Sequence, residues 1–325
     1  MSFASILSLT LLAGAAVGRP PSKFKDLRPD MLPEIKPGID QQRIEDGLNE
    51  NLPFTNYTID FFTKGEIPED CKREAEQRNY ISTDFDVFKV YYEDCDQPWI
   101  MCREKDADAE VDADEMATNF GKMPLGMREF IKHVMVVRPE GLPGASAINY
   151  MNTIIIAANS YHLRTFAHEI SHSLDWDQEV PGVTPEGMGG LSDSDHWREE
   201  YSKDNAAVSS YARTKWCEKV CCTLVLNGVP ISIWLTASHL ADTGPIALFH
   251  NVVPNGGLHT LPDDPYNEVY HAFATYISAY RDIITPRSKP RCNNKKPDSP
   301  LIHVIIDHHF VTPQVNHTIF KIGTT

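Results

Sequence analysis

The stretch TFAHEISHSLDW, from Thr165 to Trp176, decides the fold of this chain. It contains the pentapeptide HEISH, in which His168 and His172 stand four residues apart and Glu169 follows the first histidine. On a helix, residues four apart lie on one face, so both imidazoles can bind one metal ion while Glu169 points toward the same site. The pattern indicates a zinc hydrolase in which this helix carries the metal ligands.

The chemistry of zinc explains these residue types. Neutral imidazole is a good zinc ligand, and a catalytic site keeps one coordination position for water, whose pKa falls to about 7. Glu169 is the candidate general base, which takes a proton from the water and delivers it to the leaving amine. The plainer interpretation is that two histidines and one glutamate share a helix by chance.

The residues before this helix predict a strand. The run MNTIIIAANS, from Met151 to Ser160, is rich in β-branched residues, and the helix is expected to begin near Ser160. A strand in this place suits a peptidase, because an edge strand can hold an extended peptide across the metal. Alternation predicts two further strands, at Asp84–Tyr92 and His133–Val137. A helix is predicted at Asp112–Ile131, with a break near Met123-Pro124.

Composition limits the class of protein. The chain has 325 residues, of which 42% are hydrophobic, and this is enough for a sizeable core. A net charge of -15 argues against a nucleic-acid partner, because phosphate neutralisation needs clustered Lys and Arg. No later run is long and apolar enough to span a bilayer, so no membrane span is expected. The oligomeric state is left open.

The first 18 residues resemble a secretory signal, since an apolar stretch ends in the small residues Ala16 and Gly18. Asn56 and Asn316 stand in glycosylation tripeptides, as expected of an extracellular glycoprotein. Seven cysteines fit an oxidising compartment, and the odd number leaves at least one unpaired. The short spacing between Cys95 and Cys102 suggests a local disulfide.

The sequence divides into four parts. We expect a signal peptide at residues 1–18, a polar lead-in or propeptide-like region at 19–80, a metallopeptidase domain at 81–284 and a basic, Pro-rich C-terminal extension at 285–325.

Two histidines leave a catalytic zinc one protein ligand short. The metzincin pattern fails, because Asp175 replaces its glycine and Gln178 its third ligand. The aspzincin pattern fails because Val208 takes the place of its aspartate relative to Tyr211. The thermolysin-like pattern fails because a cysteine stands four residues after Glu218.

The segment YARTKWCE remains, with Tyr211 and Glu218 seven residues apart. If the segment is helical throughout, both side chains can approach one site, Glu218 as the third ligand and Tyr211 as the donor that stabilises the oxyanion. Asp195, Asp204 and His196 are competing ligands. Tyr211 as a core aromatic and Glu218 on a solvated helix face are the structural alternatives.

Five blocks of sequence occur in order between Phe85 and Asp282: DCDQPWIMCRE, NFGKMPLGMREFIKHV, FAHEISHSLDW, HWREEYSKDNAAVSSYARTKWCE and YNEVYHAFATY. With these blocks the chain resembles the secreted conidiation-specific proteins of filamentous fungi. That family is similar in its site to the lethal-factor type of metallopeptidase, in which HExxH is completed by a Tyr and a Glu seven residues apart. The resemblance implies zinc bound by His168, His172 and Glu218, with Glu169 as base and Tyr211 as oxyanion donor.

The chain departs from the family pattern directly after Glu218. About twenty residues, from Val220 to Leu240, stand between the ligand and the family-like sequence ADTGPIALFHNVVPNGG. This segment is either an additional strand or helix, or a translated intron.

We therefore expect an α+β, zincin-like fold with a small sheet, HExxH on the central helix and Glu218 on a following helix. The expected function is that of a secreted, gluzincin-like zinc endopeptidase acting on a peptide or protein substrate. The alternative is an inactive zincin-like protein that binds partners as a secreted or spore-wall component.

Overall fold

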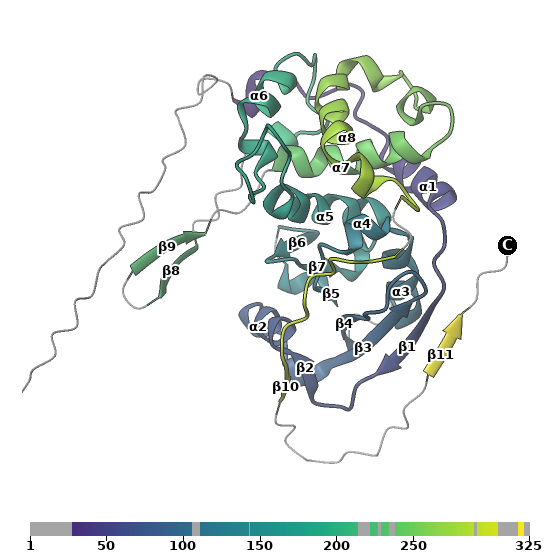
Figure 1. Cartoon of the computed structure of the whole chain (residues 1–325), viewed down its shortest axis with the longest axis vertical. Helices are drawn as coiled ribbons and strands as arrows, with labels where there is room; N and C mark the ends of the chain where they lie inside the picture. The colour runs from purple at the N-terminus through teal and green to yellow at the C-terminus, as the bar shows by residue number, and fades with distance from the viewer. Residues whose placement is uncertain are drawn as a thin grey trace, which may run out of the picture.

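The structure is a computed structural model that describes residues 28–105, 111–142, 144–213, 222–226, 229–233, 238–288, 291–304 and 318–321. The residues of the expected signal peptide and Asn316 lie outside these ranges. Figure 1 shows the arrangement of the elements. The strands are β1 (Tyr57–Phe61), β2 (Glu66–Pro68), β3 (Phe85–Tyr92), β4 (Trp99–Glu104), β5 (His133–Val137), β6 (Ala147–Tyr150), β7 (Thr153–Ala157), β8 (Cys222–Leu226), β9 (Val229–Ile233), β10 (Leu301–His303) and β11 (Thr318–Lys321). The helices are α1 (Gln41–Asn51), α2 (Glu69–Gln77), α3 (Ala113–Lys122), α4 (Leu125–Arg128), α5 (Leu163–Asp177), α6 (Asp195–Tyr201), α7 (Ser238–Val252) and α8 (Tyr270–Ile284).

A mixed sheet of seven strands organises the fold, with the order β11-β1-β3-β4-β5-β7-β6. Strand β5 runs parallel to both β4 and β7, whereas the other neighbouring pairs are antiparallel. Strands β10 and β2 form a small second sheet, and β8 and β9 pair with each other. The expected α+β class is confirmed at this level.

Alternation along the central strands builds two cores. In β5, Val134 and Val136 face the larger core, while Met135 and Val137 face the smaller one. All residues of β5 and β7 are buried, as expected of strands covered on both faces. Helices α1, α3, α5, α7 and α8 pack in the larger core, and α2 packs in the smaller one. In Figure 1, α1, α5, α7 and α8 gather above the sheet, and α2 lies at its lower left.

Several predicted elements are confirmed. Strands β3 and β5 occupy the predicted ranges, and the helix predicted between Asp112 and Ile131 is divided into α3 and α4 at Met123-Pro124. The predicted helix start near Ser160 is three residues early, because a 3-10 turn precedes α5.

The strand predicted from Met151 to Ser160 differs from the structure in one respect that matters for the site. Its β-branched part forms β7, but β7 is an inner strand that pairs with β5 and β6. The edge belongs to β6, which the sequence did not predict. Met151 and Asn152 form the tight turn between the two strands, both with positive φ.

The lead-in region contributes to this fold from Arg28 onward. Helix α1 buries Ile44 and Leu48 in the larger core. The carboxylate of Glu45, on the same helix, accepts hydrogen bonds from the backbone N–H groups of Leu163 and Arg164 at 2.9 and 3.0 Å. Since α5 has no side-chain cap of its own, Glu45 caps the helix that carries HExxH.

The C-terminal extension is joined to the sheet. Cys292 forms a disulfide with Cys95, and Ser299 bonds to the buried His133 through its hydroxyl and its backbone N–H. Strand β10 pairs with β2, and β11 with β1. Among the described residues, no helix combines the length and apolarity needed to cross a membrane.

The predicted Cys95–Cys102 disulfide is wrong. Cys102 pairs with Cys71, and Cys95 pairs with Cys292. The reason is the sheet, because Cys102 on β4 faces the smaller core with α2, whereas Cys95 after β3 lies in the larger core. A short spacing in sequence does not bring together side chains on opposite faces of a sheet.

Candidate metal centre

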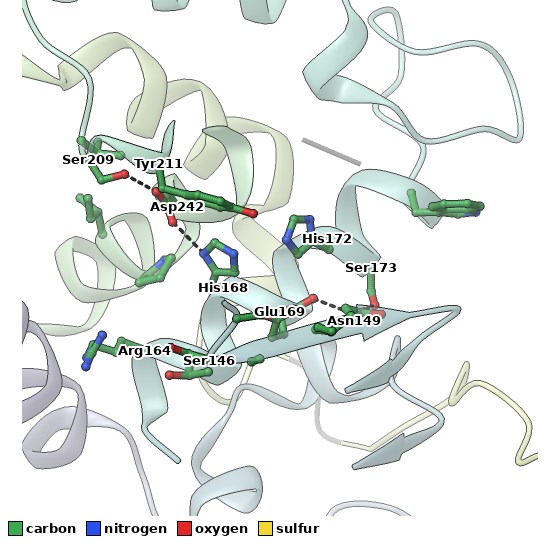
Figure 2. Close-up of a pocket in the computed structure, with 18 of the residues that line it drawn as sticks. Ser146, Asn149, Arg164, His168, Glu169, His172, Ser173, Ser209, Tyr211 and Asp242 are labelled. Carbon is green, nitrogen blue, oxygen red and sulfur yellow. Dashed lines mark hydrogen bonds and ion pairs between the residues drawn. The ribbon is translucent and has the colours of Figure 1, made fainter. Parts of the chain in front are cut away.

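Helix α5 presents the two histidines of HExxH on one face, as predicted. The ring centroids of His168 and His172 lie 5.0 Å apart, and both side chains are half-buried. Glu169 is buried, with 4% of its surface exposed, and it lines the same cleft as the histidines. Figure 2 shows the three side chains together above the sheet strands.

Asp242 on α7 fixes the orientation of His168. Its Oδ1 lies 2.9 Å from Nδ1 of His168, and its Oδ2 accepts a hydrogen bond from the Ser209 hydroxyl (Figure 2). Burial raises the pKa of Asp242, but the hydrogen bond and the charge of His168 together lower it by more. The pKa of Asp242 therefore lies below its usual value. A proton on Nδ1 directed at Asp242 leaves the lone pair of Nε2 for a metal.

His172 is held in its neutral form. Burial, followed by the neighbouring charge of His168, lowers the pKa of His172 to about 3. Neutral imidazole is the form that binds zinc, so the fold favours a ligand at this position over a solvated cation.

Asn149 on β6 joins the edge strand to α5. Its amide nitrogen donates to the backbone oxygen of Glu169 at 2.6 Å and to the Ser173 hydroxyl at 2.8 Å.

Tyr211 lies at this site. It opens a 3-10 helix, Tyr211–Arg213, and its ring centroid is 6.1 Å from that of His168. The side chain is 40% exposed and lines the cleft, so the alternative of a core aromatic is excluded. Figure 2 shows its hydroxyl reaching toward the two histidines.

Glu218 lies outside the described residues, which end at Arg213 on this side. Within the described part of the chain, no group of three or more His, Cys, Asp and Glu side chains is arranged to hold a metal. The structure therefore brings together His168, His172, Glu169 and Tyr211, and it does not test the third ligand.

The competing ligands have other surroundings. Asp204 is buried at the start of α8, where its carboxylate accepts from the backbone N–H groups of His271 and Ala272 at 2.7 and 3.0 Å. Asp195 and His196 begin helix α6. None of these three competitors is among the described residues that line the cleft.

The candidate metal centre opens into a cleft of about 1100 Å³. Helix α5 and the edge strand β6 line it, together with the lead-in near Glu34 and the middle of α7 near Pro245. The backbone oxygen of Ser146 accepts from the N–H of Ala157, so alternate residues of β6 bond to β7. The backbone groups of Ala147 and Asn149 consequently point toward the open edge of the sheet.

Sequence reasoning missed three residues that support the site. Asp242, Asn149 and Glu45 are distant from HEISH in sequence, and they belong to no spacing motif. The sequence signal for Asp242 was its place in the family-like block that begins at Ala241.

The fold and the site define a mixed α+β protein with a histidine pair beside an open sheet edge. The family model for conidiation-specific protein Con-13 matches residues 37–237, and the chain belongs to this family. "Conidiation-specific protein 13" of Neurospora crassa is 25% identical over 224 residues, which are 69% of this chain. The match spans 62% of that relative's own length. No solved structure matches the chain.

Proposed function

We propose that this protein is a secreted zinc-dependent endopeptidase with a zincin-like fold. The observation that carries the proposal is the His168–His172 pair on α5, with His168 oriented by Asp242 at 2.9 Å and both histidines open to a cleft. The donor set fits zinc, because neutral imidazoles are preferred ligands and an acidic partner on the far ring nitrogen is their usual support. Two disulfides and the signal-like residues 1–18 support secretion.

The side chains have distinct roles in this proposal. Zinc held by these ligands would supply Lewis acidity and an acidified water. Glu169 removes the proton of the attacking water and returns it to the leaving amine. Tyr211 donates its hydroxyl hydrogen to the oxyanion of the tetrahedral intermediate. An extended peptide that pairs with the open edge of β6 passes beside Glu169.

Glu218 is the proposed third ligand. Loss of one of three protein ligands weakens zinc binding markedly, so Glu218→Ala is expected to lower zinc affinity while Asp204→Ala leaves it nearly unchanged. Asp204→Ala also removes the cap of α8, so the affinity is measured per folded molecule. Zinc binding that survives Glu218→Ala and fails in Asp204→Ala would reject this assignment.

The inserted segment bears on Glu218. Between Arg213 and Ser238 only β8 and β9 are described, and the hydrogen bond between Ser209 and Asp242 holds the two flanks of this segment together. Strands β8 and β9 in between pair only with each other among the described strands. We propose that about Val220 to Leu240 are a retained intron, in which case the sequenced transcript lacks them. A uniform transcript that encodes them rejects this proposal.

A genuine insertion favours the second candidate. It would separate Glu218 from α7, and catalytic groups tolerate only about 0.5 Å of misplacement. The protein would then be a zincin-like secreted or spore-wall component that binds its partners without cleaving them.

The direct test is Glu169→Gln. The variant is expected to retain zinc and to lose at least about 10²-fold in the rate of cleavage of a denatured protein, because the base is gone while the ligands remain. Glu140→Gln, at an exposed glutamate outside the cleft, is the matched control and should cleave normally. Equal rates for wild type and Glu169→Gln would show that Glu169 is not the base.

A further inference from the structure

One face of α5 forms the floor of the cleft. Arg164, His168, His172 and Trp176 follow each other at intervals of four residues, and all four line the cleft. Residues four apart share one helix face. The histidine pair is therefore flanked by a cation at one end and by an aromatic ring at the other. Figure 2 shows Arg164 on the side of His168 that is away from Ser173.

The Arg164 guanidinium is available to a ligand. In the described part of the chain, no carboxylate lies within ion-pair distance of it, whereas Asp242 pairs with His168 and Asp177 with Lys296. Glu34 also lines the cleft and forms no ion pair with another described residue. Glu45 accepts a hydrogen bond from the backbone N–H of Arg164, and the guanidinium forms no hydrogen bond with another described residue. A guanidinium with its donors unused binds carboxylates well, and here it lies in a chain with a net charge of -15.

The other end of the cleft carries two exposed apolar side chains. Trp176 and Met151 line it with 39% and 49% of their surfaces exposed. The turn that carries Met151 is joined to the end of α5 that carries Trp176, because the amide of Asn152 donates to the Asp177 carboxylate at 2.7 Å, and Asp177 also pairs with Lys296 at 2.9 Å. Large apolar side chains that remain exposed beside a candidate catalytic group are suited to cover a bulky apolar side chain.

We infer that the cleft takes an extended peptide with an acidic side chain at Arg164 and a bulky apolar side chain at Trp176 and Met151. The inference rests on the proposed function, since it places the scissile bond between these two contacts. The twelve residue steps from Arg164 to Trp176 span about 18 Å of helix. An extended chain advances about 3.3 Å per residue, so the two recognised side chains are about four to six residues apart.

Peptide binding to full-length Glu169→Gln protein, measured by fluorescence anisotropy, tests this inference without cleavage. The probes are alanine-based fluorescein peptides with a glutamate and a phenylalanine five residues apart, made in both orders. One order is expected to bind at least about tenfold more tightly than the same peptide with lysine in place of glutamate. A similar loss is expected when alanine replaces phenylalanine.

Variants assign each preference to its residue. Arg164→Glu is expected to reverse the preference between glutamate and lysine, and Trp176→Ala to remove the preference for phenylalanine. The matched controls are Arg281→Glu and Met188→Ala, which change exposed residues outside the cleft and should keep both preferences.

The outcomes separate this inference from the proposed function. Weak binding of all peptides, or equal binding of the glutamate and lysine peptides in both orders, overturns it. Peptides bound with the expected preference by a wild type that never cleaves them would leave it standing and reject the peptidase proposal. Cleavage by the wild type without either preference would overturn the inference and support the peptidase proposal.

Discussion

Asp242 is the residue on which the geometry of the proposed metal centre depends most. It is the carboxylate that bonds the far ring nitrogen of His168, and Ser209 holds its second oxygen. This arrangement favours one tautomer and one ring plane of His168, the proposed ligand. The HExxH spacing predicted the two histidines and Glu169, but a supporting carboxylate on another helix has no fixed spacing from them, so the motif could not identify Asp242.

Asp242→Asn keeps the shape of the side chain and removes its charge. Zinc affinity is expected to fall about 10- to 100-fold, because a neutral amide supports the imidazole more weakly than a carboxylate does. Competition with a chelator of known affinity measures the change. Asp263→Asn, at an exposed aspartate that already has positive φ, is the control and should bind zinc as the wild type does. An unchanged affinity in Asp242→Asn would mean that His168 does not bind the metal through Nε2.

His133 connects the C-terminal extension to the sheet through its neutral form. Its Nδ1 lies 3.3 Å from the oxygen of Ile100, and its Nε2 accepts from the N–H of Ser299 at 3.1 Å. Burial lowers the pKa of His133 to about 4. Protonation of Nε2 would remove the acceptor for Ser299, so acid should weaken this attachment.

The free energy of unfolding should therefore contain a pH-dependent part from His133. A folded-state pKa of about 4, below the ordinary value of 6.5, gives a contribution that is complete above pH 6.5 and is lost as the pH falls toward 4. Its size is on the order of 3 kcal/mol. Urea unfolding of wild type and His133→Gln at several pH values in this range measures the contribution. It is the difference between the two proteins in how their free energy of unfolding changes with pH.

Asp204 titrates in both of these proteins. Burial raises its pKa to about 7, although the N–H groups of His271 and Ala272 oppose the shift. Its contribution to the pH dependence of the free energy of unfolding has the opposite sign to that of His133. Because it is the same in both proteins, it cancels when wild type and His133→Gln are compared. Parallel pH profiles for wild type and His133→Gln would contradict the role given to His133.

At the scale of elements, the contact between α5 and α7 places Asp242 against His168. Gly244 permits this contact, because a Cβ at its position would lie 1.9 Å from the Ser171 hydroxyl oxygen. That hydroxyl already bonds the oxygen of Ala167 and the hydroxyl of Tyr276, at 2.6 Å each. There is no room for a methyl group between the helices.

Gly244→Ala tests this packing. Helix propensity alone predicts stabilisation by about 1 kcal/mol, whereas overpacking predicts destabilisation by about 1–3 kcal/mol. We expect destabilisation, together with weaker zinc binding, because α7 carries Asp242. Gly38→Ala has nothing within 4 Å of the added Cβ and should change the free energy of unfolding by less than about 0.5 kcal/mol. A more stable Gly244→Ala protein with normal zinc affinity would refute the close contact.

The central elements were predictable, and the edge strand was not. A buried run of β-branched residues such as Thr153–Ala157 predicts a strand from local sequence alone. By contrast, β6 has four residues that are all half-buried, so it shows no alternation. Its turn to β7 uses Met151-Asn152 in place of the Asn-Gly pair that signals a hairpin.

At the scale of the whole molecule, segments far apart in sequence complete the fold. Cys95 and Cys292 are 197 residues apart, and Glu45 caps a helix that begins at Leu163. Such pairings depend on the final topology, and the composition of these polar, Pro-rich regions indicated only loops. The described residues before residue 81 and after residue 284 therefore acquire structural roles that local patterns could not reveal.

Zinc content tests the central claim most directly. Full-length protein purified without chelators and analysed by atomic absorption is expected to hold about one zinc ion per chain. His172→Ala is expected to hold almost none, while His259→Ala, an exposed histidine outside the cleft, should match the wild type. A wild type that takes up no zinc from buffered solution, or a His172→Ala protein that holds as much zinc as the wild type, would contradict the account.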